Sequence, residues 1–310
     1  MPADAHDRPL HEPQQWVDLN VRDLGAVEGA AHWPATTHAI RAGVDAVRRA
    51  GGGTLRIPAG QFTAAPFNMT SNMTLYLERD AVLSGTDVFA AHPIIPPLPS
   101  YGAGRDHAGG NRRTSLVHGE HLTNVKVLGD WGTIDGNGAP WWMARANGSE
   151  GSVTRGSLIE FMYCDGVEIA NLHLKDSPFW TGAMRRPCHR RILWLRYFIV
   201  FVNLTRAMLF VCSALVMASI ALATVHPYAS RHVHVHDVDI SSPPGSLNTD
   251  GVDPDSCEDV VIENMRYTGG DDAIAIKSGD QKRPCRLPAV QSLVHSRSLQ
   301  LLTSALCAAC

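Results

Sequence analysis

Two short acidic segments carry the residues whose types and spacing could do chemistry. Asp250 lies in the run Asn248-Thr-Asp-Gly251, and Asp271 and Asp272 directly follow the glycine pair Gly269-Gly270. Two carboxyl groups held close together cannot both ionise freely, so one pKa rises and that group keeps a proton near neutral pH. Its ionised partner can then activate a water molecule. Such a proton donor and base are what hydrolysis of a glycosidic bond requires.

The competing interpretation of these acidic segments is structural. Asp-Gly pairs are turn residues, and acidic loops commonly do no more than solvate a surface. For Asp253 and Asp255, which follow the same run, we prefer this interpretation because Asx side chains commonly cap turns. It suits Asp271 and Asp272 less well, since they stand between two glycines and the apolar pattern Ala273-Ile-Ala-Ile276, which indicates a buried strand.

The elements that must position these carboxylates are short strands closed by turns. From about residue 54, runs rich in Val, Ile, Leu and Thr end at Gly, Asn or Asp, which favour turns. Examples are residues 54–57, 74–77, 125–128, 158–161, 167–169, 172–174, 233–235 and 260–262. Helical periodicity is convincing only near residues 36–50, where an apolar stripe ends at three glycines. Strands without intervening helices predict an all-β sandwich or a solenoid.

The spacing of the strands favours the solenoid. A polar residue, a short strand and a loop recur at Asn171, Asp237 and Asn264, and a similar strand precedes each of them. The 27 residues from Asp237 to Asn264 suit one coil that carries a loop. Asp250 and Asp271 are 21 residues apart, which suits one coil without a loop. They should therefore lie on adjacent strands roughly 4.8 Å apart in the backbone.

Composition excludes several classes of protein. The 310 residues are 45% hydrophobic and 18% charged, which is typical of a chain that buries a core. A net charge of −3 gives no basic field for nucleic acid, so we expect no such partner. The seven cysteines lack the spacing of zinc ligands. His232, His234 and His236 alternate on one strand, which cannot wrap an ion by itself, so we expect no metal and no other cofactor.

The motifs taken together resemble one known family. They are residues 51–60, 93–102, 132–138, 154–156, 176–181, Asn248–Gly251 and Gly270–Asp272. Over about residues 18–181 and 225–279, the chain resembles the plant-type polygalacturonases of glycoside hydrolase family 28. The resemblance implies an all-β fold, a right-handed parallel β-helix of the single-stranded, pectin-lyase-like kind with an N-terminal capping helix. It also implies hydrolysis of α-1,4-galacturonosyl bonds in pectin with inversion, as part of cell-wall carbohydrate metabolism.

The resemblance also implies roles for individual residues. Asp271 resembles the general acid, and Asp250 and Asp272 resemble the pair that positions and deprotonates the attacking water. Asn248 would support that cluster or contact sugar. Because pectic polysaccharide is a polyanion, its binding cleft should hold a cation. Lys277 is the nearest candidate for substrate binding, although on a strand it could equally project into solvent. We expect the protein to act as a monomer.

Two segments depart from the family pattern. Residues 182–224 hold six arginines and no acidic residue, and 197–225 form an apolar stretch of transmembrane length, so we expect an apolar helical insert. Joining Thr181 to Val225 restores a family-like run, Ser-Pro-Phe-Trp-Thr-x-His-Pro. Residues 280–310 stand where the family has further coils. The expected organisation is an N-terminal tail at 1–17, β-helix coils at 18–181 and 225–279, and non-family segments at 182–224 and 280–310.

Location and activity each have an alternative. The N-terminus has neither a basic nor an apolar signal region, so no signal peptide is expected, whereas the resemblance implies a secreted cell-wall enzyme. The alternative location is a membrane, reached through residues 197–225. The alternatives to polygalacturonase activity are an inactive truncated or anchored splice product, or a relative that acts on another pectic polysaccharide.

Overall fold

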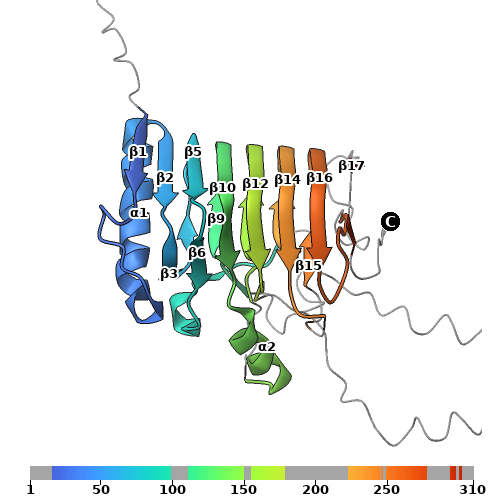
Figure 1. Cartoon of the computed structure of the whole chain (residues 1–310). Helices are drawn as coiled ribbons and strands as arrows, with labels where there is room; N and C mark the ends of the chain where they lie inside the picture. The colour runs from blue at the N-terminus through green and yellow to red at the C-terminus, as the bar shows by residue number, and fades with distance from the viewer. Residues whose placement is uncertain are drawn as a thin grey trace, which may run out of the picture.

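The described chain is built almost entirely of parallel strands (Figure 1). The computed structural model describes residues 16–98, 111–149, 155–178, 223–244, 246, 249–277, 294–297 and 300–301. The larger sheet contains β1 (Val17–Asn20), β2 (Gly53–Ile57), β3 (Gly60–Ala64), β5 (Met73–Leu77), β6 (Ala81–Gly85), β10 (Thr123–Asp135), β12 (Asp165–Lys175), β14 (Arg231–Ser241), β16 (Glu258–Thr268), β17 (Val294–Arg297) and β18 (Gln300–Leu301). The second sheet contains β4 (Phe67–Asn68), β9 (Val117–Glu120), β11 (Ile159–Met162), β13 (Ala223–Tyr228) and β15 (Asp250–Val252).

Each coil from β9 onward gives one short strand to the second sheet and one long strand to the larger sheet. The order β10-β12-β14-β16 in the larger sheet follows the chain, and so does β9-β11-β13-β15 in the second. Only β7 (Ile94–Ile95) and β8 (Arg112–Arg113) pair antiparallel among the described strands. The chain therefore winds in one direction, and each coil stacks on the previous one, as the predicted solenoid requires.

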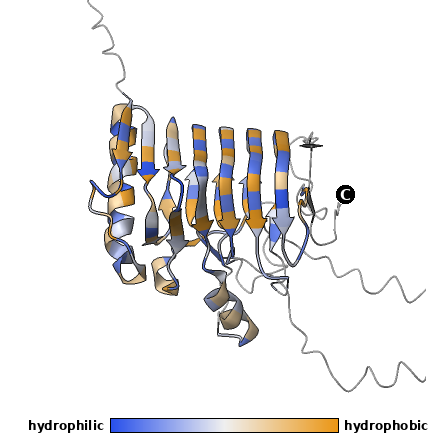
Figure 2. Cartoon of the chain, in the orientation of Figure 1, coloured by the Kyte–Doolittle hydropathy of each residue, from blue (hydrophilic) through white to orange (hydrophobic). Residues whose placement is uncertain are grey.

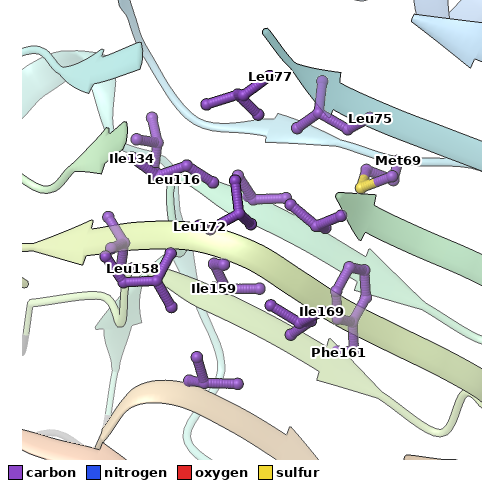
Figure 3. Close-up of a cluster of buried hydrophobic side chains, with 14 of the residues drawn as sticks. Met69, Leu75, Leu77, Leu116, Ile134, Leu158, Ile159, Phe161, Ile169 and Leu172 are labelled. Atoms are coloured by element: carbon purple, nitrogen blue, oxygen red, sulfur yellow. The ribbon is translucent and has the colours of Figure 1, made fainter. Parts of the chain in front are cut away.

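Columns of aliphatic side chains fill the interior of the coils. Val127, Ile169, Val235 and Ile262 are partners on β10, β12, β14 and β16, and none is more than 1% exposed. Side chains alternate between inside and outside along each strand, which Figure 2 shows as alternating hydrophobic and hydrophilic bands. Residues of the second sheet, such as Phe161, pack against them in the same core (Figure 3).

The corners of the coils use residues that tolerate a left-handed backbone. Asn171, Asp237 and Asn264 hold the same place in β12, β14 and β16, with φ of 56°, 50° and 51°. Asn and Asp adopt this conformation at lower cost than other residues with side chains. The recurring polar residue in the sequence is therefore the residue that turns each coil.

One long helix covers the N-terminal end of the coils. Helix α1 (Trp33–Ala50) begins with Pro34 in its first turn and ends at Gly51, whose φ of 78° is left-handed. Its buried stripe includes Ala39, Ile40 and Val44 and packs on the first coils. The predicted capping helix is confirmed. A coil end left bare would expose its apolar interior to water.

A second helix was not predicted. Helix α2 (Gly138–Ala146) follows β10, and its Trp141 stacks on Phe89 with ring centroids 4.0 Å apart. The sequence analysis found convincing helical periodicity only near residues 36–50 and so missed this helix. Nine residues, with Gly138 and Pro140 at the start, are too few to show a helical period, and tertiary packing of Trp141 supplies what the local pattern lacks.

Parts of the chain that depart from the family pattern lie mostly outside the described residues. This holds for 179–222, which contain most of the expected helical insert, and for most of 278–310. Ala223 and Thr224 belong to β13, so the β-helix is already formed two residues before the expected boundary at Val225. Within the described ranges, no helix has the length and apolar character needed to cross a membrane.

Candidate active site

The two acidic segments meet at the end of the described coils. Strand β15 carries Asp250, and the turn after β16 carries Asp271 and Asp272. Oxygen atoms of these three carboxyl groups all lie within 4.8 Å of one another. The three residues predicted to be catalytic are therefore brought together.

The register between the two segments differs slightly from the expected one. Val252 pairs with Ile274, and the Gly251 N–H donates to the Asp272 carbonyl at 2.9 Å. The coil is thus 22 residues long at this point, and Asp272, not Asp271, lies beside Asp250. Asp271 comes one residue earlier, in the turn. Because the chain turns there, the side chains of both successive aspartates can point toward Asp250.

Two glycines allow the segments to approach this closely. A Cβ atom on Gly251 would collide with the carbonyl oxygen of Ala273, and one on Gly270 would collide with that of Ser246. The glycine pair before Asp271 therefore does more than favour a turn. It lets the backbone of one acidic segment lie against the other.

Hydrogen bonds tie the two segments together. The Tyr267 hydroxyl lies 2.8 Å from the carbonyl oxygen of Thr249 and 2.9 Å from that of Asp271. The Gly270 N–H donates to the Thr249 hydroxyl at 3.1 Å, and the Asp272 N–H donates to Asp271 Oδ1 at 3.0 Å. These bonds fix the backbone on both sides of the site, and one of them reaches a carboxylate oxygen, Asp271 Oδ1.

Burial and repulsion act on the carboxyl groups in the same direction. Asp250 is fully buried, and burial together with the charge of Asp253 raises the pKa of Asp250 well above its ordinary value. The pKa of Asp272 is also raised, first by burial and then by the charge of Asp271. The ammonium group of Lys277 opposes both shifts. The site therefore holds protons more tightly than separate surface aspartates would.

Lys277 faces inward. Its side chain is 13% exposed, and Nζ lies 2.7 Å from Asp253 Oδ2 and 3.8 Å from Asp250 Oδ2. The structural interpretation of Asp253 as a solvated turn residue is wrong, because Asp253 is fully buried against this lysine. The same interpretation is wrong for Asp255, which is also fully buried and forms bridges with Tyr228 and Lys277. Its Oδ1 accepts a hydrogen bond from Ser256 Oγ at 2.8 Å. Asn248 lies outside the described residues.

A second buried charged group was missed by the sequence analysis. Both carboxylate oxygens of Glu160 accept hydrogen bonds from Arg112 Nη1, at 2.7 and 2.6 Å. His226 Nδ1 lies 3.2 Å from Glu160 Oε1, and His118 Nδ1 lies 3.3 Å from Oε2. We call these four residues the Glu160 cluster. All four are buried.

The strand register joins this cluster to the acidic site. His118, Glu160 and His226 are partners on β9, β11 and β13. Val225 pairs with Val252, so Asp253 comes next in the same column after His226. The imidazole of His226 lies close enough to Asp253 to act on its pKa. In the sequence the only signal is one polar residue inside an apolar strand, as in Leu158-Ile-Glu-Phe161.

The three-aspartate group also has the spacing of a cation site. Hard cations such as Ca²⁺ take about six to eight oxygen ligands. In the described part of the chain, no fourth His, Cys, Asp or Glu joins Asp250, Asp271 and Asp272. The three side chains also suit a site without an ion, in which one carboxyl group is the acid and the other two hold and deprotonate a water molecule.

Comparison with known sequences identifies the family. The family model described as "Glycosyl hydrolases family 28" matches residues 51–187 and 211–286, so the chain belongs to this family. A probable polygalacturonase of Vitis vinifera is 39% identical over 229 residues, which are 74% of this chain and 38% of that protein. A probable polygalacturonase of Arabidopsis thaliana is 24% identical over 158 residues, 51% of this chain and 24% of that protein. The chain thus spans less than two fifths of either relative.

Comparison with solved structures supports the same fold. A polygalacturonase from Erwinia carotovora superposes with a TM-score of 0.61 at 18% identity, covering 96% of this chain and 65% of that one. An exopolygalacturonase from Thermotoga maritima gives a TM-score of 0.59 at 21% identity, covering 85% of this chain and 55% of that one. The predicted right-handed parallel β-helix is confirmed.

Proposed function

We propose that the protein hydrolyses α-1,4-galacturonosyl bonds in pectin or polygalacturonate, with Asp250, Asp271 and Asp272 as the catalytic residues. The observation that carries this proposal is the meeting of the three carboxyl groups within 4.8 Å. Membership of a family of glycosyl hydrolases supports the reaction type. Two plant relatives described as probable polygalacturonases support the substrate.

The reaction needs one proton donor and one base. Asp271 gives its proton to the glycosidic oxygen while the bond from the anomeric carbon to that oxygen breaks. A water molecule attacks the anomeric carbon, and Asp250 together with Asp272 takes up the proton that the water loses. One water is consumed for each bond, and proton exchange with solvent returns each carboxyl group to its starting state.

The stereochemical proposal depends on the family resemblance alone. Inverting glycosidases in general hold their two carboxyl groups roughly 6.5–9.5 Å apart. The oxygen atoms of this site lie within 4.8 Å, so the general spacing rule does not predict inversion here. Proton NMR of the first product from a galacturonan oligomer decides between the two outcomes. A β-anomer from an α-bond supports inversion, and an α-anomer contradicts it.

Substitution of the proposed acid tests the activity itself. Asp271→Asn keeps the shape of the side chain but removes the proton donor, and should lower reducing-sugar release from polygalacturonate by about 10²- to 10⁴-fold. Asp130→Asn is the matched control, because Asp130 lies on the outer face of β10 and pairs with Arg79. Release that is equal in the wild type and Asp271→Asn, or absent from a folded wild type, would overturn the proposal.

The same assay separates the alternative functions. Binding of polygalacturonate without release of sugar would identify a non-catalytic pectin-binding protein. Release from rhamnogalacturonan but not from polygalacturonate would identify a relative with another pectic substrate. The name of the Vitis vinifera relative favours polygalacturonate as the first substrate to test.

We also propose that the protein works as a monomer in the cell wall, after secretion. Exported proteins can carry N-linked glycans at Asn-x-Ser/Thr. Asn68 and Asn147 lie in such sequences and both are exposed. Glycosidase treatment of protein from the native tissue should lower its apparent mass, and Asn68→Gln should remove part of that change. An unchanged mass would contradict export through the glycosylation route. Gel filtration measures the apparent mass in solution and so tests whether the protein is a monomer.

A further inference from the structure

Two backbone contacts hold Lys277 in place. Its N–H donates to the carbonyl oxygen of Pro254 at 2.8 Å, and its own carbonyl accepts from the Ser256 N–H at 2.8 Å. A bridge pairs Lys277 with Asp255 on the preceding coil. The lysine side chain therefore starts from a defined point, and its Nζ reaches two buried carboxylates, Asp253 and Asp250.

The surroundings of Asp250 oppose its ionisation. Asp250 faces Asp253 on its own segment and Asp271 and Asp272 from the next coil, all of which carry the same charge when ionised. The cation that acts on it is Lys277. A base must be ionised to accept a proton from water. The proposed role of Asp250 therefore depends on a nearby positive charge.

We propose that Lys277, paired with Asp253, is a positioning residue that favours the ionised form of Asp250 and holds it in place for activation of water. This inference rests on the proposed hydrolytic function and assigns to Lys277 a role other than binding the carboxylate of the sugar. Asp253 holds the ammonium group at 2.7 Å, and the same ammonium lies 3.8 Å from Asp250.

The pairing with Asp253 disfavours a direct role in substrate binding. Lys277 Nζ is already committed to a carboxylate that is fully buried. Moving the ammonium toward a sugar would leave Asp253 buried without its cation, which is strongly unfavourable. His226, on the preceding coil, also lies near Asp253, and its Nδ1 atom contacts Glu160. Asp253 thus lies near two protein groups, while the Lys277 side chain is 13% exposed.

Enzyme kinetics separates the two roles. Lys277→Met removes the charge but keeps most of the length of the side chain. If Lys277 positions Asp250, the acidic limb of the pH–rate profile moves to higher pH in this variant. At a pH on that limb, kcat then falls about tenfold for each pH unit of the move, and KM for oligogalacturonate changes less than about twofold. Lys277→Arg, which keeps the charge, should retain more activity than Lys277→Met. A raised KM with unchanged kcat and an unmoved acidic limb would overturn the proposal.

A double variant tests the part of Asp253. Asp253→Asn in the Lys277→Met background removes the carboxylate that was left without its cation, together with its repulsion of Asp250. We expect the double variant to recover part of the kcat lost in Lys277→Met and to return the acidic limb toward lower pH. Additive losses in kcat would show that the two residues act separately, and would overturn the proposed pairing.

An NMR titration keeps this inference separate from the proposed function. Carboxyl ¹³C shifts of aspartate, assigned through Asp250→Asn, report the protonation of Asp250 without turnover. The pKa of Asp250 should be higher in Lys277→Met than in the wild type, and an unchanged value overturns the inference. A wild type that hydrolyses no pectic polymer would overturn the proposed function, while this titration would still decide whether Lys277 controls Asp250.

Discussion

Two charged clusters lie along the second sheet, and they differ in their balance of charge. In the Glu160 cluster, one carboxylate receives two hydrogen bonds from Arg112 and faces two imidazoles, those of His118 and His226. The Asp250 cluster, which we define as Asp250, Asp253, Asp271, Asp272 and Lys277, contains four carboxyl groups and one ammonium group, which lies beside Asp253 and Asp250. The Glu160 cluster is built on β9, β11 and β13 with Arg112 from β8, and the Asp250 cluster is built on β15 and the segment that follows β16.

The difference shows that burial alone does not decide the behaviour of a carboxyl group. Glu160 and Asp250 are both at most 1% exposed. Although burial opposes it, Arg112 and the imidazoles hold the pKa of Glu160 well below its ordinary value, whereas burial and Asp253 raise that of Asp250. Cations beside a buried carboxylate favour its ionised form, as at Glu160, whereas the excess of carboxyl groups around Asp250 opposes the ionised form that its proposed role as a base needs.

The largest effect on stability is expected at Glu160. Glu160→Gln keeps the size of the side chain but leaves Arg112 buried without its carboxylate, which should lower the free energy of unfolding by about 3–5 kcal/mol. Urea denaturation at neutral pH measures the loss. Arg112→Met combined with Glu160→Gln is the control, because removal of both charges should cost less than the sum of the single losses. If Glu160→Gln lowers the free energy of unfolding by less than about 1 kcal/mol, the claim that the cations around Glu160 make it a stabilising group is wrong.

The pH dependence of stability should have opposite signs in the two clusters. Asp253 is buried beside Lys277, and burial raises its pKa from 3.8 to about 6. A raised pKa means that the folded state binds the proton more tightly, so the contribution of Asp253 to stability falls as pH rises between these two values. Glu160 has a lowered pKa, so its contribution is present above about pH 4.5 and is lost as pH falls below it.

Unfolding curves over a pH series test these signs. Asp253→Asn should flatten the change between about pH 4 and pH 6, which amounts to about 1.4 kcal/mol for each unit of pKa shift. Glu160→Gln should instead flatten the loss at acid pH. A variant that flattened the opposite region would contradict the assignment of charge balance to the two clusters.

The fold was predictable because its signals are local. Asn171, Asp237 and Asn264 mark the corners of three coils, and each was visible in the sequence as a polar residue after a short apolar strand. The meeting of Asp250, Asp271 and Asp272 was predictable for a similar reason, since each lies in a short motif and the two motifs are about one coil apart. Helix α2 was not, because Trp141 packs on Phe89, which lies in a short 3₁₀ helix about 50 residues earlier in the chain.

The buried partners of the site could not be predicted because they depend on register between coils. Glu160 and His226 are 66 residues apart in the chain, and Arg112 and Glu160 are 48 apart. Glu160 is one polar residue in an apolar run, a pattern shared by many outward-facing residues, and Arg112 lies among polar residues, Asn111-Arg-Arg-Thr-Ser115, that give it no distinct signal. Burial of Asp253 also depends on Lys277 in the following coil. Only the register of the coils shows that these residues share a column.

Substitution of Asp250 should change the free energy of unfolding less than substitution of Glu160, and in the opposite direction. Asp250→Asn removes one of the excess charges and leaves Lys277 paired with Asp253, so the free energy of unfolding at neutral pH should stay equal or rise by up to about 1 kcal/mol. Urea denaturation measures it, with Asp253→Asn as the matched control, since that change takes away the nearest carboxylate of Lys277. Destabilisation of Asp250→Asn as large as that of Glu160→Gln would show that charge balance does not distinguish the clusters.

The smallest effect is expected for an ion pair on the outer face of the larger sheet. Arg79 donates two hydrogen bonds to Asp130, at 3.1 and 2.8 Å, and the two side chains are 66% and 45% exposed. Water solvates both charges when they separate, so Arg79→Met should cost at most about 1 kcal/mol, and less at high salt. Denaturation at low and high ionic strength measures this. A loss comparable to that of Glu160→Gln would mean that the geometry of an ion pair, and not its burial, governs stability in this β-helix.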